Sequence, residues 1–170
     1  VYSLALAFVS KYKAKLRLNQ QIFGKWVILF FATLLMSCSE NPKTPLSEKE
    51  TFEITVYALG ETMDDISFEP EQIEAPAGKL LQVKLINKST AIGMFHNIVF
   101  YTFGEGQKVG FNSIASGQSK NYIPNLPEVI SGSKMVEMGD SKTIEFPAPA
   151  VGQYNYSCTF PGHYSKMTGV

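Results

Sequence analysis

The chain has 170 residues, enough for one domain of ordinary size, and 45% of them are hydrophobic while 18% are charged, which suits a globular β-rich protein. Basic and acidic residues balance at fifteen each, but residues 1–37 carry five basic residues and no acidic one, so the remainder holds ten basic and fifteen acidic residues. This net charge of −5 on the remainder argues against nucleic acid as a partner.

The front of the chain has the order of an export signal. A basic stretch (residues 11–25) leads into an apolar run of eleven residues (26–36), and small residues follow it at 37–39. The apolar run is shorter than the ~20 residues that a membrane-spanning helix needs. A signal peptide over residues 1–37 is therefore favoured over a transmembrane segment.

The four residues Leu35-Met-Ser-Cys38 resemble the lipobox of bacterial lipoproteins. The resemblance implies cleavage before Cys38 and transfer of a diacylglycerol to its sulfur; an ordinary cleavage site with a chance cysteine is the alternative. Buried acyl chains contribute ~0.8 kcal/mol per CH2, so such an anchor would hold the protein on a membrane surface. The implied location is the bacterial cell envelope, on its periplasmic or surface side, and Ser39 favours the outer membrane. Residues 38–50, which are polar and contain two prolines, are expected to form a tether.

Residues 51–170 show short apolar segments separated by turn residues. Residues 52–58 and 81–85 alternate apolar with polar side chains, the period of a strand with one buried face. A long excursion with room for a short helix is expected over residues 104–127. Short strands at near-regular spacing predict an all-β fold, a Greek-key β-sandwich or barrel of about seven to eight strands. Further strands are expected over residues 66–75, with an interruption around Pro70, and over residues 95–101, 129–136, 141–146 and 153–158.

One loop near the end of the chain carries three metal-binding side chains. Cys158, His163 and Met167 follow the pattern C-x4-H-x3-M. A thiolate, an imidazole and a thioether favour copper, and a second imidazole would complete a trigonal His2Cys set with a long axial Met, as in electron-transfer copper sites. The chain has only one other histidine, His96, in an apolar run. A disulfide in an exported protein is the alternative use of two cysteines, but Cys38 and Cys158 each have the better use given above.

The segment Cys158-Thr-Phe-Pro-Gly-His163, with Met167 after it and His96-Asn97 before it, resembles the cupredoxins, most closely the azurin and auracyanin branch of small blue copper proteins. The similarity extends more weakly over residues 51–170. The resemblance implies one copper ion that cycles between Cu(I) and Cu(II), bound by the two histidines and the cysteine, with Met167 as a weak axial ligand. Taken singly, each of these residues has an ordinary alternative as a core side chain.

The resemblance also implies roles for residues beside the ligands. The backbone carbonyl of Phe95 would approach the metal from the other side, at a position where azurins have a glycine. Asn97 would join the two ligand segments by hydrogen bonds. An apolar patch near His163 would bind a redox donor and a redox acceptor transiently, over a small area. The residues of this patch are Met94, Phe95, Pro161, Gly162 and Tyr164.

Three classes of function follow from these residues. A blue copper electron carrier, which is not an enzyme, is favoured. Multicopper oxidases place a histidine beside the cysteine, whereas here its neighbours are Ser157 and Thr159; the binuclear site of cytochrome oxidase needs a second cysteine where this chain has Gly162. A copper-delivery protein without a redox role would use the same ligands and stays open.

Overall fold

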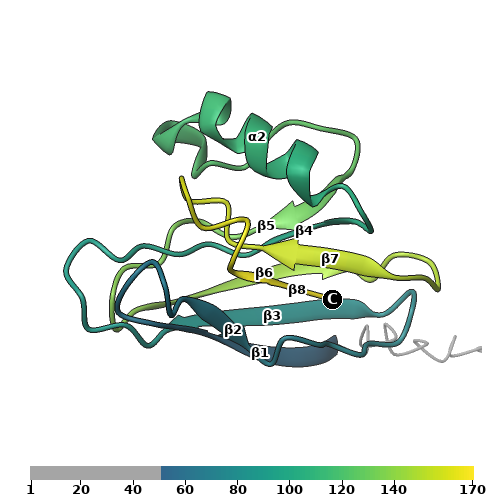
Figure 1. Ribbon diagram of the computed structural model, residues 1–170. Coiled ribbons are helices and arrows are strands. Elements are labelled where there is room, and N and C mark those ends of the chain that lie inside the picture. The colour runs from purple at the N-terminus through teal and green to yellow at the C-terminus, as the bar shows by residue number, and fades with distance from the viewer. Residues whose placement is uncertain (1–50) are drawn as a thin grey trace, which may run out of the picture. The chain divides into compact units, whose positions relative to one another are not determined.

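The computed structural model describes residues 51–170, so the predicted signal peptide, Cys38 and the tether lie outside the described residues. Residues 47–170 form one compact unit. Its described part has eight strands, one α-helix and one 3-10 turn (Figure 1). These are β1 (Thr51–Leu59), β2 (Ser67–Glu69), β3 (Leu80–Asn87), β4 (Val99–Thr102), α2 (Gly106–Ser116), η2 (Gln118–Lys120), β5 (Val129–Gly132), β6 (Ser141–Pro147), β7 (Tyr154–Ser157) and β8 (Thr168–Gly169).

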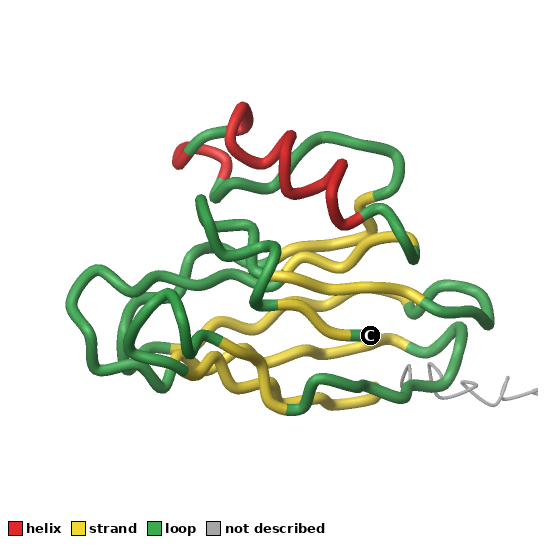
Figure 2. The backbone as a smooth tube through the Cα atoms, viewed as in Figure 1, coloured by secondary structure: helices red, strands yellow, loops and turns green. Residues whose placement is uncertain are grey.

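The strands form two sheets of four, in the orders β2-β1-β3-β6 and β5-β4-β7-β8. The neighbours β1 and β3 run parallel, and the other paired strands are antiparallel. Figures 1 and 2 show the two sheets as stacked layers, with α2 over the edge of the second. The predicted β-sandwich is therefore confirmed.

The core lies between the sheets, where the period of two places the apolar side chains. Val56 on β1 and Val83 and Leu85 on β3 are fully buried, and they face Phe100 on β4 and Tyr156 on β7. Rings of Phe100 and Tyr156 lie 5.4 Å apart. The alternation in residues 52–58 and 81–85 thus predicts the buried face correctly.

β7 is one residue shorter at each end than the sequence predicts, and three other strands are shortened more, each for a local reason. β2 ends at Glu69 because Pro70 has no N–H to donate to a ladder. His96 forms a single bridge with Val136, and the continuous ladder of β4 begins only at Val99. β5 ends at Gly132, after which the chain bends toward that bridge.

The excursion expected over residues 104–127 contains the helix α2. Val109 on the helix is buried against Val99 and Tyr101 on β4, so the helix covers a second, smaller apolar cluster. Gly110 is the position where the helix approaches the ligand loop, because a Cβ there would overlap the ring of Tyr164. No helix among the described residues is both long enough and apolar enough to cross a membrane.

Candidate metal centre

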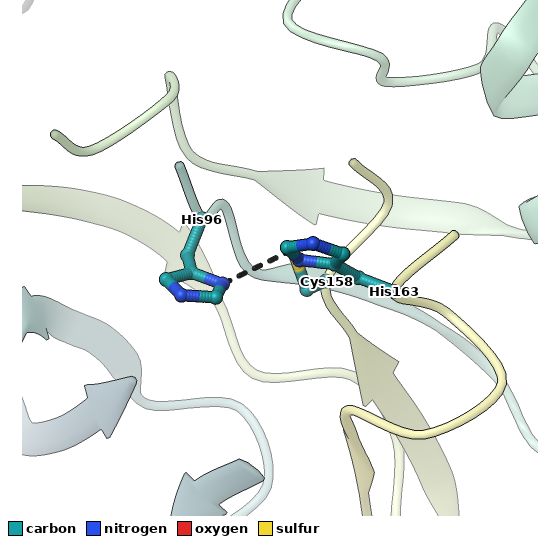
Figure 3. Close-up of side chains that lie close together, drawn as sticks. All are labelled: His96, Cys158 and His163. Atoms are coloured by element: carbon teal, nitrogen blue, oxygen red, sulfur yellow. Dashed lines mark hydrogen bonds between the residues drawn. The ribbon is translucent and has the colours of Figure 1, made fainter. Parts of the chain in front are cut away.

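The fold brings three predicted ligands together at one end of the sandwich (Figure 3). His96 lies at the bridge before β4, Cys158 directly follows β7, and His163 lies in the loop after it. The Cys158 Sγ is 3.7 Å from Nδ1 of His96 and 3.5 Å from Nδ1 of His163. One donor atom from each residue lies within 4.8 Å of the other two.

The two S···N separations fit a small metal ion bound by Cys158 and either histidine. Nitrogen and sulfur donors bind such ions at about 2.0–2.3 Å, so donors at the corners of a trigonal plane lie about 3.5–3.8 Å apart. The two S···N distances, 3.7 and 3.5 Å, fall in this range. The three side chains are 0–1% exposed, so the centre is closed to solvent.

Met167 closes the ligand loop and is fully buried. Its N–H donates to the carbonyl of His163 at 2.8 Å, and its own carbonyl accepts from the N–H of Cys158 at 3.0 Å. Two predicted ligands are thus fixed to Met167 through the backbone. Phe95, the residue before His96, is half-buried, and its ring lies 6.2 Å from that of Phe160.

Burial sets the protonation of the ligands in the metal-free chain. Burial lowers the pKa of His96 to about 4, with a smaller contribution from His163, whose own pKa burial also lowers. Burial raises the pKa of the Cys158 thiol to about 12, although backbone hydrogen bonds from Asn97 and Phe160 oppose that shift. At neutral pH both imidazoles are therefore neutral, and a metal ion has one proton to displace, that of the thiol.

One buried nitrogen of the ligand set has no hydrogen-bond partner in the described part of the chain. The Nε2 atom of His96 is buried and has no hydrogen-bond partner among the described residues, while its Nδ1 faces the Cys158 sulfur at 3.7 Å. Buried polar atoms are normally satisfied, because leaving one without a partner costs about 1–3 kcal/mol. A metal ion bound through Nδ1 would place the imidazole proton on Nε2 and leave that atom without a partner, so this cost remains whether or not a metal is bound.

Asn97 joins the two ligand segments, as the resemblance implies. Its Oδ1 accepts from the N–H of Thr159 at 2.7 Å, and its Nδ2 donates to the Oγ1 of Thr159 and to the carbonyl of Asn121, both at 2.8 Å. Asn97 and Thr159 are fully buried. The residue after His96 is therefore fixed to the residue after Cys158.

Two asparagines that hold the ligand segments were not identified from the sequence. Asn87, at the end of β3, donates through Nδ2 to the carbonyls of Met94 at 2.9 Å and Val136 at 3.1 Å. Asn121 accepts at Oδ1 from the N–H of Met135 at 3.0 Å. Asn87 could have been noticed in the sequence, because it is a polar residue at a position where the alternation of β3 predicts a buried side chain. Asn121 had none, since its partners come from distant segments.

Aromatic side chains cover the imidazole of His163. The ring of Phe160 lies 4.9 Å from it, and the ring of Tyr122 packs edge-on against Phe160 at 5.6 Å. Of the residues predicted to form an apolar patch, Gly162 is exposed and the other four are half-buried. The ligand ring is thus hidden behind a thin layer of apolar groups.

Comparison with known proteins gives consistent matches. A family model described as a cupredoxin-like domain matches residues 26–169. Auracyanin-B and auracyanin-A of Chloroflexus aurantiacus are 29% and 27% identical to the chain over 104 and 114 residues, which are 59% and 65% of this chain. The matched part spans 44% of auracyanin-B, less than half of its length, and 69% of auracyanin-A.

Solved structures of auracyanins have a similar fold. A dithionite-reduced auracyanin from Roseiflexus castenholzii superposes with a TM-score of 0.61 at 34% identity, covering 69% of this chain and 92% of that one. Auracyanin A of Chloroflexus aurantiacus, described as a "blue" copper protein, gives a TM-score of 0.63 at 26% identity, covering 71% and 96%.

Proposed function

Because the chain belongs to the cupredoxin-like family, we propose that it is a blue copper protein that transfers single electrons between two redox partners. The observation that carries this proposal is the closed cluster of two neutral imidazoles and a thiol within 4.8 Å. His96, Cys158 and His163 would bind the copper, with Met167 as the axial ligand and the Phe95 carbonyl opposite. When bound, copper supplies a one-electron Cu(I)/Cu(II) couple to such a ligand set.

In this function the protein would keep the ligands in place while the copper ion gains or loses an electron. Cu(I) and Cu(II) prefer different geometries, so ligands that cannot follow either preference reduce the rearrangement at each transfer. Asn97 fixes both ligand segments to each other, and Asn87 fixes the segment before His96. Such hydrogen bonds around the ligands orient them and tune the metal.

The partners would bind over the patch of Met94, Phe95, Pro161, Gly162 and Tyr164. His163 is the ligand next to this patch, and because it is 1% exposed, a partner would contact the apolar groups that cover it. Phe160, which is half-buried, lies against the imidazole at 4.9 Å and would be one of the groups between this ligand and a partner. A small apolar contact area suits a transient redox encounter.

We further propose the organisation predicted from the sequence. Residues 1–37 would be a lipoprotein signal peptide, Cys38 the lipidated first residue of the mature protein, and residues 38–50 a tether to the copper domain of residues 51–170. The protein would then act on the periplasmic or surface side of a bacterial envelope, most simply at the outer membrane. The order of basic, apolar and small residues before Cys38 supports this arrangement.

Burial of the ligands favours a held metal over a delivered one. His96, Cys158 and His163 are all nearly or fully inaccessible, so a copper acceptor cannot reach them without opening of the loop. An oxidase-type enzyme is the second alternative; the neighbours of Cys158, which are Ser157 and Thr159 and not a histidine, disfavour it.

The first test is the visible spectrum of the compact unit Ser47–Val170 after addition of Cu(II). An intense thiolate-to-copper charge-transfer band that disappears with ascorbate and returns in air is the expected result for a His2Cys site. A folded protein that stays colourless would overturn the proposal. A band that forms but does not cycle would favour the delivery protein.

Two variants make the test specific to the sulfur ligand. Cys158→Ser keeps the size of the side chain and removes the thiolate, so the band should vanish. Ser157→Ala is the matched control, because the Ser157 hydroxyl is buried without a hydrogen-bond partner among the described residues. The control should keep both the fold and the colour.

A further inference from the structure

A hollow of about 440 Å³ lies beside the aromatic side chains that cover His163. Three aromatic residues line it, namely Phe95, Tyr122 and Phe160. The ring of Phe160 lies 6.2 Å from that of Phe95 and 5.6 Å from that of Tyr122. The same ring is 4.9 Å from the imidazole of His163. Because Phe95 also belongs to the patch proposed to bind redox partners, the hollow adjoins that patch.

Glu137 is the one charged residue in the lining of the hollow, beside the uncharged amides Gln118 and Asn121. Its side chain is exposed, and no ion pair joins its carboxylate to another described residue. The basic residues nearest to the lining in sequence, Lys120 and Lys134, do not line the hollow. A carboxylate beside aromatic rings attracts a cation in two ways, through its own charge and through the negative faces of the rings. The composition of the hollow therefore suits a cationic group.

One wall of the hollow has an uncommon backbone conformation. Asn121 and Tyr122 have φ values of 52° and 54°, the only positive ones at non-glycine residues in the described part of the chain. Side chains rarely adopt such values, and where surrounding contacts hold them there, the position is often part of a binding site. The N–H of Tyr122 donates to the carbonyl of Gly117 at 3.0 Å, and the carbonyl of Asn121 accepts from Nδ2 of Asn97 at 2.8 Å. The backbone that carries the Tyr122 ring is thus tied to the segment of His96.

The surroundings of the hollow favour a protein that carries positive charge. Ile92 precedes the lining residue Gly93 and is 93% exposed, and Met138 follows Glu137 and is 48% exposed. Exposed apolar side chains next to an aromatic hollow are typical of a surface that another protein covers. Residues 51–170 contain twelve acidic and eight basic residues, a net charge of −4. Long-range attraction therefore favours a basic partner over an acidic one.

We propose that this hollow receives the guanidinium group of an arginine side chain on a basic redox partner, and so holds the partner against the cover of His163. Arginine suits the lining better than lysine does. Its planar guanidinium stacks on aromatic faces and pairs with a carboxylate through two N–H groups, whereas an ammonium group is more strongly hydrated. One anchoring side chain keeps the contact area small, as in a transient redox encounter. That the partner is a redox protein rests on the function proposed above; the guanidinium site itself does not.

The guanidinium site is tested by NMR on the compact unit Ser47–Val170, with Cu(I) and without metal, with N-acetylarginine amide as the probe. Saturable shifts of the Met135 methyl group and the Tyr122 ring are expected. N-acetylcitrulline amide has nearly the same shape and no charge, and it should bind about tenfold more weakly. Glu137→Gln should weaken binding of the arginine probe about two- to fivefold. Glu53→Gln is the matched control, because Glu53 is an exposed residue of β1 outside the lining.

Any of three results would overturn the guanidinium site. The first is no saturable shift of the Met135 methyl group with the arginine probe. The second is equal affinity for the arginine and citrulline amides, which would show that the hollow does not select a cation. The third is equal binding of the arginine probe by Glu137→Gln and Glu53→Gln, which would show that the charge of Glu137 has no part in it.

The role in electron transfer is tested by flash photolysis of the Cu(II)-loaded unit with two ruthenium trisbipyridine complexes, one with a butylguanidinium arm and one with a butylurea arm. The excited ruthenium(II) complex gives one electron to Cu(II), which forms ruthenium(III) and Cu(I). The guanidinium arm should produce a fast first-order phase whose amplitude saturates with protein concentration, and the urea arm only a second-order phase. Glu137→Lys should remove the fast phase.

Equal kinetics with the two arms would overturn the docking role of the hollow. If the unit forms no charge-transfer band with Cu(II), the proposed electron-transfer function fails, and the assignment of a redox partner fails with it. The two amides still decide the guanidinium site in that case, because their binding is also measured without metal.

Discussion

Asn97→Ala tests whether one side chain fastens the two ligand segments together. The amide makes three hydrogen bonds, two with Thr159 and one with the carbonyl of Asn121. The substitution leaves the buried N–H of Thr159 without a partner, which costs about 1–3 kcal/mol. The carbonyl of Asn121 lies on a half-buried residue and can take a water, and the Thr159 hydroxyl can rotate. We therefore expect a loss of about 1–3 kcal/mol, from the N–H of Thr159 alone.

The measurement is urea unfolding of the metal-free compact unit, followed by fluorescence and circular dichroism. Asn112→Ala is the matched control, because Asn112 donates only to the carbonyl of Lys108 on the exposed face of α2. The control should change the unfolding free energy by less than about 0.5 kcal/mol. A loss below about 1 kcal/mol for Asn97→Ala would refute the fastening role. In the copper-loaded protein, Asn97→Ala should also broaden the charge-transfer band, because the ligands would be held less firmly.

Three further predictions concern protons and packing. Burial lowers the pKa of His96 from 6.5 to about 4. Between these two pH values the unfolded metal-free chain therefore binds a proton that the folded chain does not bind. The folded state should have its full stability above pH 6.5 and lose about 3 kcal/mol as the pH decreases to 4. Urea midpoints that stay constant over this pH window would contradict it. Burial raises the pKa of the Cys158 thiol to about 12, so Cu(II) binding at pH 7 should release one proton. A pH-stat titration measures this release. If no proton is released, the metal-free site already holds a thiolate and the prediction is wrong. Gly110→Ala puts a methyl group into the ring of Tyr164 and should destabilise the unit by about 1–2 kcal/mol in thermal unfolding, despite the better helix propensity of alanine; a stabilised variant would show that the ring moves aside freely.

The sequence predicts the fold best where a strand is half-buried. Residues 52–58 and 81–85 alternate cleanly, and both strands form there. The interruption expected at Pro70 is found as the end of β2 at Glu69, and the strand does not resume as far as residue 75. Periodicity fails around His96, which bridges to a single residue, Val136, before the β4 ladder begins. The apolar run there was long enough for a strand, but its first residues bond to the irregular segment after β5: His96 pairs with Val136, and Ile98 bonds to Ser133.

The ligands could be named from the sequence because their chemistry is rare and their spacing is short. Cys158 and His163 are five residues apart, and the chain has only one other histidine. The groups that hold them are ordinary asparagines and threonines whose partners are far away in sequence. The partner of Asn97 is 62 residues distant, and one partner of Asn87 is 49 residues distant. The pairing of the sheets brings such groups together, so spacing alone does not reveal their partners: the role of Asn97 was predicted only from the family resemblance, and the alternation of β3 marks Asn87 only as a buried polar residue.

Folding and construction of the metal centre are the same event in this chain. The bridge between His96 and Val136 ties the segment before β4 to the segment after β5, and the bond from Cys158 to Met167 continues the ladder of β7 and β8. The ligands are therefore placed by contacts among the chain's own residues, and folding of the sandwich gathers them at one end of it. A metal that binds these ligands adds stability to the folded state by mass action. Both of its oxidation states would be held by the same backbone.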